Sequence, residues 1–416
     1  MWKRWRIRIL LFLAVLGPGF ITANVDNDSG GILTYSQAGA QYGYTLLWTM
    51  IPITIALIVV QEMCARMGVV TGKGLSDLIR EEFGLRLTVI LMVLLVVVNY
   101  TNVVTEFIGI VGSLHLFHVS KFVSVPVCAA LVWFLVIRGD YKSTEKIFLA
   151  ASLVYITYIF AGVLSQPSWH DALWATVKLP ANSVWHEKAY IYMAIGVVGT
   201  TIAPWMQFYL QSSIVEKGIR VKDYAASRLD VVVGSIFTDL IAWFIVVACA
   251  ATLFVHGMGA IQVAADAAEA MRPLAGDYAF VLFAFGLFNA SLFSASILPL
   301  STAYTVCEGL GVESGVDKSF KEAPFFYWLY TTLIIGGAIT VLVLPDAQLI
   351  NVAVFSQVLN GVLLPVVIIL MLLLINRTDL MGEHKNSRLW NVIAWSTSII
   401  VIGMTGAMLW GMVPGH

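Results

Sequence analysis

Charged residues are scarce in this sequence. Asp, Glu, Lys and Arg make up 12% of its 416 residues, whereas hydrophobic residues make up 59% and the mean hydropathy is +0.86. This composition excludes a soluble globular domain and predicts a chain that crosses the lipid bilayer many times. The formal net charge of −1 provides no basic surface, so no nucleic-acid partner is expected.

Cysteine is also scarce, and its spacing excludes two kinds of site. The four cysteines form no CxxC pair and lie far apart in or beside apolar runs: Cys64, Cys128, Cys249 and Cys307. Neither a disulfide framework nor a thiolate metal site is predicted, and we expect small packing residues. HExxH, GxSxG and Walker-type motifs are absent, and no histidine falls in the middle of an apolar run. The chain is therefore not expected to be an enzyme or to need a cofactor.

Eleven apolar runs are long enough to cross a membrane as helices. The first spans 9–44 and the sixth spans 189–214, and both are interrupted. The others span 46–68, 87–113, 122–138, 146–165, 231–256, 278–305, 325–345, 349–375 and 389–412. Together they predict an all-α membrane protein with a single transmembrane domain over residues 1–416.

The Lys and Arg residues predict how the chain is oriented. With a cytoplasmic N-terminus, twenty of the 24 fall on the inner side and four on the outer side: Lys121, Lys178, Lys188 and Arg272. Such an asymmetry follows the positive-inside rule and predicts a multi-pass protein of the cell membrane with an extracellular C-terminus. It also supports eleven helices, because omitting one would scramble the alternation.

The interruption of the first run places two carboxylates near the middle of the membrane. It reads Gly17-Pro-Gly-Phe-Ile-Thr-Ala-Asn-Val-Asp-Asn-Asp-Ser-Gly-Gly31. Its glycines and proline weaken the helix, and the Ser-Gly-Gly that follows Asp28 predicts a break just after that residue. A carboxylate beside freed backbone carbonyl groups is the outline of a cation site.

The sixth run has a matching interruption between Gly196 and Trp205. Pro204 cannot donate a backbone hydrogen bond, and Gly199 loosens the same turn. Two broken helices five helices apart are typical of a transporter with inverted repeats and alternating access. Residues 9–165 would form the first repeat, 189–375 the second, and 389–412 an additional helix 11.

Ionisable residues in the apolar runs are candidate functional residues, because a charge there costs at least ~2.5–3.5 kcal/mol. Asp28 is the first of them, with helix capping or pairing to a lysine as its alternative role. Asp26 and Asn27 share the break, and Asp26 reaches the same ion only if the helix is unwound. Asp239 lies inside the seventh helix, where a hydrogen bond to a neighbouring hydroxyl is the alternative.

The third helix carries a polar stripe. Asn99, Asn102 and Glu106 share one face, and a carboxylate on that face favours an ion or proton pathway over a polar seam between helices. Three glutamines of other helices either line a cavity or hold helices together: Gln207, Gln211 and Gln357.

At these positions the sequence resembles the NRAMP family of divalent-metal transporters. The likeness runs through most of the chain and is close in Gly17-Pro-Gly-Phe, in Gln37-Ala-Gly-Ala-Gln-Tyr-Gly-Tyr44 and in Cys64-Ala-Arg-Met-Gly-Val-Val-Thr-Gly-Lys73. It includes the stretches around Glu106 and Gln357. The resemblance implies the LeuT-type fold, a 5+5 inverted repeat with helices 1 and 6 broken at mid-membrane.

The departures from the family pattern fall in the metal site. The first-helix signature Asp-Pro-Gly-Asn reads Asp-Ser-Gly-Gly here, so the aspartate is kept as Asp28 and the ligand asparagine becomes Gly31. The sixth-helix signature Met-Pro-His reads Ala-Pro-Trp, so the metal-binding methionine becomes Ala203. The resemblance implies two further ligands, the side chain of Gln357 and the backbone carbonyl of Thr200.

The loss of the methionine bears on the choice of metal. A thioether favours Mn²⁺ and Fe²⁺, and without it the site no longer discriminates against Mg²⁺ and Ca²⁺. Mg²⁺ is usually held by one or two carboxylates plus waters, which suits a roomy site around Asp28. The sequence is similar to the NRAMP-related magnesium transporters, in which alanine replaces the methionine.

The resemblance implies inward transport of Mg²⁺, with Mn²⁺ as a further candidate cargo. Trp205 replaces a family histidine and Val103 replaces an aspartate, so obligatory proton coupling is not expected. The main alternative is a proton-coupled Mn²⁺/Fe²⁺ transporter with a degenerate site. An organic-solute transporter needs partners for a carboxylate and an ammonium group, and a membrane enzyme needs a nucleophile with a base; neither is present. Paired breaks favour alternating access over a channel. No oligomeric state is indicated.

Overall fold

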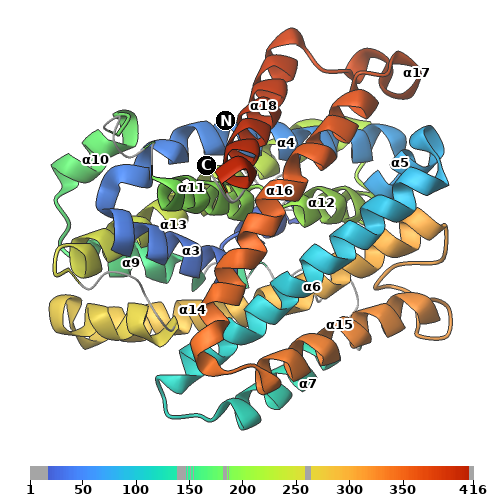
Figure 1. The fold of residues 1–416 in the computed structure, drawn as a ribbon. Helices are drawn as coiled ribbons and strands as arrows, with labels where there is room; N and C mark the ends of the chain where they lie inside the picture. The colour runs from blue at the N-terminus through green and yellow to red at the C-terminus, as the bar shows by residue number, and fades with distance from the viewer. Residues whose placement is uncertain are drawn as a thin grey trace, which may run out of the picture.

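Helices form every regular element of the part of the chain that the structure describes. The computed structural model describes residues 17–137, 147, 149, 151–152, 154–180, 185, 187–257 and 264–411. Figure 1 shows long helices packed against one another, with α16 crossing in front of α11 and α3. This helical architecture agrees with the all-α prediction.

The first half of the chain contains two short helices where the first apolar run was predicted. These are α2 (Pro18–Val25) and α3 (Ser29–Tyr42). The elements that follow are η1 (Gly43–Thr49), α4 (Met50–Thr71), α5 (Leu75–Phe83), α6 (Leu85–His115), α7 (Lys121–Ile137), α9 (Ile156–Leu164) and α10 (Trp169–Val177).

The second half begins with another pair of short helices, α11 (Lys188–Thr201) and α12 (Pro204–Glu216). The elements that follow are α13 (Tyr224–Cys249) with the π-helical turn η4 (Ala250–Phe254), α14 (Ala264–Leu310), α15 (Pro324–Val343), α16 (Leu349–Ile375), α17 (Thr378–Met381) and α18 (Arg388–Gly411). The bounds of α16 match the prediction, whereas α13 and α14 begin earlier than predicted.

Eight helices of the described residues are long and apolar enough to cross a membrane. One of these spans, Ser29–Thr71, joins the second part of the first predicted helix to the second helix, and Lys121–Ile137 is apolar but shorter. Residues 9–16 and much of 146–155 lie outside the described residues. The count of eleven helices therefore stays a prediction.

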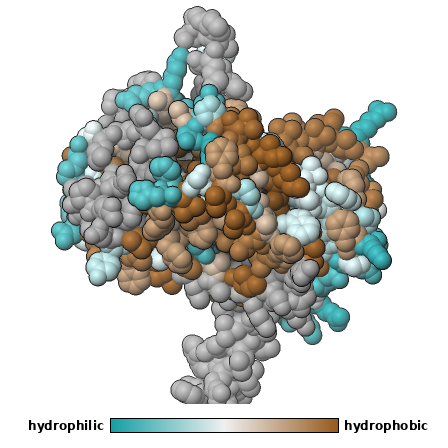
Figure 2. Space-filling model, turned by 90° about the horizontal axis from the view of Figure 1, so that it is seen from below, coloured by the Kyte–Doolittle hydropathy of each residue, from teal (hydrophilic) through white to brown (hydrophobic). Residues whose placement is uncertain are grey.

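Apolar side chains cover much of the molecular surface. Figure 2 shows a broad apolar face between polar edges, seen from the side on which α6, α7, α14 and α15 lie in Figure 1. Ile90, Phe122 and Trp328 are 60%, 66% and 62% exposed on these helices. So large an apolar surface is expected of a protein surrounded by lipid. All four cysteines are free and buried, which agrees with their predicted packing role.

The break in the first helix lies at residues 26–28, not in the Ser-Gly-Gly that follows Asp28, as predicted. Helix α2 ends at Val25 and α3 begins at Ser29, so residues 26–28 form the unwound segment. Asp28 is extended (φ −66°, ψ 178°), and its Oδ1 accepts a hydrogen bond of 2.6 Å from the backbone N–H of Gly31. The carboxylate thus caps α3, which starts directly after it.

The break in the sixth helix lies where it was predicted. Helix α11 ends at Thr201, Ala203 is extended, and Pro204 opens α12 at the first helical position. A proline fits there because that position has no intrahelical partner for an N–H. Two residues, Ile202 and Ala203, are left outside both helices.

Asp230 of α13 fixes the start of α2. Its carboxylate accepts backbone N–H groups from Gly17 (3.3 Å), Gly19 (2.8 Å) and Phe20 (3.1 Å). A methyl group on Gly19 would lie 2.8 Å from the backbone nitrogen of Val231. The Gly-Pro-Gly segment therefore lets α2 lie directly against α13, with an acidic side chain at its positive end.

We expect Asp230→Ala to destabilise the protein by about 1–3 kcal/mol, because three buried N–H groups lose their acceptor. Asp230→Asn keeps one acceptor oxygen, so its stability should lie between that of the native chain and that of Asp230→Ala. Thermal unfolding of the purified protein measures the effect as a lower midpoint temperature. A midpoint for Asp230→Ala equal to that of the native chain would contradict this role.

Candidate functional site

The two helix breaks face each other across the middle of the bundle. The Tyr35 hydroxyl of α3 lies 2.7 Å from the Thr201 hydroxyl at the end of α11. A methyl group on Gly196 would touch Thr34 at 3.5 Å, which places the two helices side by side. The unwound segment of the first helix is therefore held close to the second break.

Three oxygen atoms converge beside Gly31. A methyl group built on this glycine would lie 2.6 Å from the backbone oxygen of Asp26, 3.0 Å from Thr200 Oγ1 and 3.4 Å from Asp28 Oδ1. Thr200 Oγ1 is buried and has no hydrogen-bond partner. Carboxylate, hydroxyl and carbonyl oxygens are the ligands that hard cations prefer. The three oxygens approach the backbone of Gly31 so closely that only a glycine fits between them.

Gln357 of α16 reaches the same place from another helix. Its amide nitrogen lies against Gly30, and its backbone oxygen would lie against a methyl group on Gly199 of α11. Its Oε1 accepts a 2.9 Å hydrogen bond from Asn360 Nδ2. Asp28, Thr200 and Gln357, which come from three distant parts of the sequence, thus meet around Gly30 and Gly31.

A polar network behind Gln357 connects α16 to α6. Asn360 and Asn102 exchange two hydrogen bonds of 3.1 Å, and Ser356 Oγ donates to Asn102 Oδ1 at 2.7 Å. The structure thus assigns Asn102 to the interhelical seam that holds Gln357. Asn360 was not identified from the sequence, although it follows Gln357 by three residues and shares its face.

Glu106 of α6 lies against the first residue of α3. Its Oε2 accepts the Ser29 backbone N–H at 3.2 Å, while Oε1 is buried without a partner. Ser29 Oγ donates to the Thr105 backbone oxygen at 2.6 Å. Glu106 and Asp28 therefore both face the positive N-terminal end of α3.

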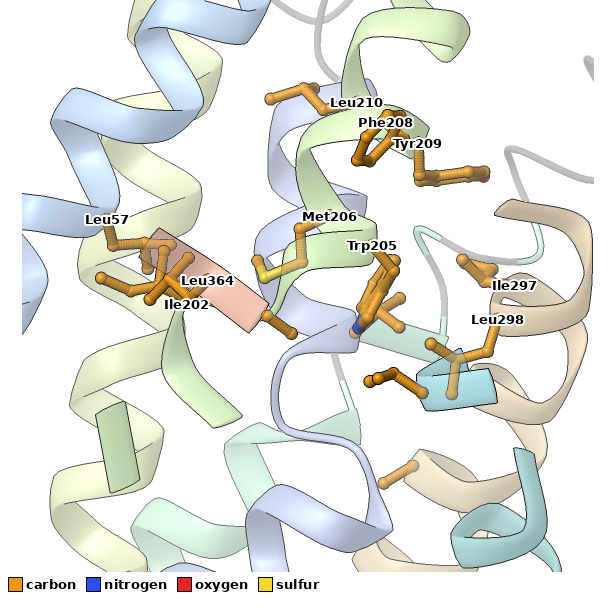
Figure 3. Packing of buried hydrophobic residues seen from close by; sticks show 14 of the residues in the cluster. Leu57, Ile202, Trp205, Met206, Phe208, Tyr209, Leu210, Ile297, Leu298 and Leu364 are labelled. Atoms are coloured by element: carbon orange, nitrogen blue, oxygen red, sulfur yellow. The ribbon is translucent and has the colours of Figure 1, made fainter. Parts of the chain in front are cut away.

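The residues after the second break are mostly packed. Figure 3 shows Trp205 on the side of Ile297 and Leu298, with Ile202 on the other side beside Leu57 and Leu364. Trp205 is 1% exposed and its backbone oxygen accepts a 3.2 Å hydrogen bond from Ser301. It contributes bulk beside the break and no ligand atom. Ala203 is the N-cap of α12 and is 3% exposed.

The two glutamines of α12 have different surroundings. The amide nitrogen of Gln207, in the orientation that gives it hydrogen-bond partners, donates to the backbone oxygens of Ala203 and Pro204 at 2.6 and 2.7 Å. It closes the first turn of α12. Gln211 donates to the backbone oxygen of Lys73 at 2.8 Å and thereby joins α12 to the segment after α4. Gln211 is not brought to Asp28.

A cavity of about 970 Å³ opens at the end of the bundle where α3 ends and α11 and α16 begin. Its polar lining is neutral and consists of Gln37, Gln41, Tyr42, Tyr192, Gln348 and Asn351. Met193 and Val354 add apolar lining. Along their helices, Val354 is one turn from Gln357, Gln37 is about two turns from Gly31, and Met193 is about two turns from Thr200. The cavity therefore leads toward the oxygen cluster.

Histidine and cysteine do not contribute to this site. In the ranges that the structure describes, no group of three or more His, Cys, Asp or Glu side chains is arranged to hold a metal ion. A cation at the oxygen cluster beside Gly31 would depend on Asp28 together with neutral oxygen donors and water.

Comparison with known proteins places the chain in a family. Residues 19–411 match the family described as "Natural resistance-associated macrophage protein-like". A divalent metal cation transporter, MntH, of Deinococcus radiodurans is 26% identical over 98% of this chain and 91% of its own length. The MntH of Yersinia enterocolitica is 25% identical over 96% of each chain.

Solved structures share the fold. A manganese transporter of Eremococcus coleocola, crystallised with an aromatic bis-isothiourea compound, superposes with a TM-score of 0.76 at 21% identity over 97% of this chain and 89% of that one. Mhp1, a nucleobase-cation-symport-1 family transporter, superposes with a TM-score of 0.59 at 13% identity over 95% and 92%.

Proposed function

The chain belongs to the natural resistance-associated macrophage protein-like (NRAMP) family and is a divalent metal cation transporter, and on that premise we propose that Mg²⁺ is its principal cargo. The observation that carries the proposal is the oxygen cluster beside Gly31. Its donors are Asp28 Oδ1, Thr200 Oγ1 and the Asp26 backbone oxygen, with the Gln357 side chain adjacent. None of these groups supplies sulfur, so a soft metal gains no preference.

The two departures from the family pattern remove side-chain ligands, and this supports an ion that keeps much of its water. Gly31 has no side chain, and an asparagine there would place its Cβ 2.6 Å from the Asp26 backbone oxygen. Ala203 offers only a methyl group at the second break. Mg²⁺ sheds its waters reluctantly, and a site with one carboxylate and few other ligand atoms lets it keep several.

Mn²⁺ is the second candidate cargo, because the Eremococcus coleocola structure is titled a manganese transporter. Hard oxygen ligands accept Mn²⁺ as well as Mg²⁺. A proton-coupled Mn²⁺/Fe²⁺ transporter is therefore the competing function, and selectivity distinguishes the two.

We further propose that uptake follows the membrane potential without obligatory proton transport. Trp205 and Val103 cannot titrate, and Glu106 is the carboxylate that remains in the third helix. A divalent cation moving inward through 100 mV gains roughly 4.6 kcal/mol, at ~2.3 kcal/mol per charge, which drives uptake without a second ion.

We expect proteoliposomes that hold the protein and a pH dye to take up Mg²⁺ with no matching acidification. An inside-negative potassium diffusion potential should increase the initial rate, because the potential acts on the charge of the ion. Acidification in fixed proportion to Mg²⁺ uptake would contradict the proposal and favour the proton-coupled alternative.

We also propose eleven membrane helices in a LeuT-type 5+5 repeat, with the N-terminus in the cytoplasm and the C-terminus outside. The broken pairs α2–α3 and α11–α12 and the likeness to Mhp1 support the repeat. The cavity would then open to the outside, and alternating access would carry the ion past Asp28 to the cytoplasm.

Cysteine labelling tests this orientation, since all four native cysteines are buried and give little background. Ser168→Cys, before α10, should react with an impermeant maleimide added outside intact cells. Ser387→Cys, before α18, should react only after the membrane is opened. Both positions are exposed. The reverse pattern would contradict the orientation.

A further inference from the structure

Two carboxylates beside the first helix break lack any hydrogen-bond partner. Asp26, in the unwound segment, is 2% exposed, and Asp239, in the middle of α13, is 4% exposed. All four of their carboxylate oxygens are buried without a hydrogen bond. The proposed Mg²⁺ site uses only the backbone oxygen of Asp26, so these oxygens are left without a role.

The chain brings these two carboxylates together. Asn27, next to Asp26, donates its amide N–H groups to the backbone oxygen of Thr238 at 2.9 Å and to its hydroxyl at 2.6 Å. Thr238 directly precedes Asp239. Asp26 and Asp239 are therefore close enough for their charges to interact, and Tyr35 of α3 lies near both.

A third side chain of this segment, that of Asn27, also has an oxygen without a partner. Asn27 Oδ1 belongs to the amide whose nitrogen binds Thr238, and it is buried without a partner. Asn27 itself is fully buried. An amide held so firmly by its nitrogen end presents its oxygen in a fixed direction, which is suited to a ligand atom.

Among the described residues, nearby side chains supply no positive charge, and the Thr54 hydroxyl beside Asp239 is neutral and donates to the backbone oxygen of Met50. The charges that act on Asp26 are those of Asp239 and Asp28, and both are negative. A buried carboxylate stays ionised only beside a partner, because burial of an unpaired charge costs many kcal/mol and otherwise favours the protonated form. In a protein that carries divalent cations, such a cation is the partner with the right sign and charge.

We propose that Asp26, Asp239 and the amide oxygen of Asn27 form a second divalent-cation site, next to the oxygen cluster at Gly31. Water completes the coordination, as Mg²⁺ commonly requires in sites with one or two carboxylates. The inference rests on the proposed function for the nature of the ion, and it assigns a role to residues that the first site does not use.

The two sites use the same or adjacent residues at both helix breaks. Asp26 contributes its backbone oxygen to the first site and its carboxylate to the second. On α11, the Thr200 hydroxyl borders the first site, and its neighbour Thr201 binds Tyr35, which borders the second. Neighbouring residues therefore serve both sites, and the charge of an ion at one site weakens binding at the other by electrostatic repulsion.

Calorimetric titration of the full-length protein in lipid nanodiscs with MgCl₂ tests this site. We expect two ions per native chain, one in Asp239→Asn and one in Asp28→Asn. Asp239→Asn should also raise the midpoint of thermal unfolding without divalent cations, since it removes a buried carboxylate that has no partner. It should lose the part of the Mg²⁺ stabilisation that comes from the second ion and keep the part that comes from the first. Asp230→Asn is the matched control on the same helix and should keep two ions.

One bound ion in the native protein, retained with the same affinity by Asp239→Asn, would overturn the second site. The same titration with MnCl₂ separates this result from a failure of the proposed cargo. If Mn²⁺ binds at two sites and Mg²⁺ at none, the second site stands and the choice of Mg²⁺ is wrong.

Discussion

Uptake of Mg²⁺ should fall by at least about 100-fold when Asp28 is replaced by asparagine, a loss of about 2.7 kcal/mol. Asp28 is the charged donor of the oxygen cluster, whereas the Thr200 hydroxyl and the Asp26 backbone oxygen are neutral. The neutral amide keeps an oxygen that can accept the Gly31 N–H, so the cap of α3 is retained. The substitution therefore tests the charge and not the helix.

The initial rate of Mg²⁺ uptake into proteoliposomes, read with a fluorescent indicator, measures this effect. Asp379→Asn is the matched control, because that carboxylate is exposed and pairs with Arg377 on the surface. It should transport at the native rate. Uptake by Asp28→Asn within about twofold of native, with equal protein incorporated, would contradict the assignment of the site.

A change in selectivity is the second large effect, and it is expected when Ala203 is replaced by methionine. The new thioether would sit at the N-cap of α12, beside the second break. Soft ligands favour Cd²⁺ and Mn²⁺ over Mg²⁺, so we expect Cd²⁺ to inhibit Mg²⁺ uptake at a concentration lower by about tenfold or more, or ~1.4 kcal/mol. Mg²⁺ uptake itself should decrease, because the side chain occupies space for water.

Ala203→Leu separates the sulfur from the bulk. Leucine has nearly the volume of methionine and no ligand atom, so it should reduce Mg²⁺ uptake without increasing sensitivity to Cd²⁺. Equal Cd²⁺ sensitivity in the two variants would show that the second break does not contact the ion. The family's asparagine cannot be restored in the same way, since Gly31 has no room for a Cβ.

The sequence predicted the two breaks because their causes are local. Pro204 ends the hydrogen-bond ladder of α11 wherever it lies, and the glycines around Asp28 weaken their own helix. The predicted position of the first break was wrong by about one helical turn. The prediction followed the flexibility of Ser29-Gly-Gly, whereas the carboxylate of Asp28 caps α3 and makes those residues its first turn.

Contacts between distant segments were beyond the sequence. Asp230 and the start of α2 are more than 200 residues apart, as are Asn27 and Thr238. Helical periodicity places residues on faces of one helix but does not say which helices meet. The same limit hid the neutral cavity, whose lining comes from α3, α11 and α16, and the seam that links Asn102 to Asn360.

The identity of the transported ion is the central proposal for this protein. Uptake of Mg²⁺ into proteoliposomes that hold the native protein, with equal external Mn²⁺ or Ca²⁺, tests it most directly. We predict that Mg²⁺ accumulates and that equal Mn²⁺ lowers its rate by no more than about half, since oxygen ligands give neither ion a tenfold advantage. Movement of Mn²⁺ alone, or loss of Mg²⁺ uptake at a small fraction of equal Mn²⁺, would contradict the account.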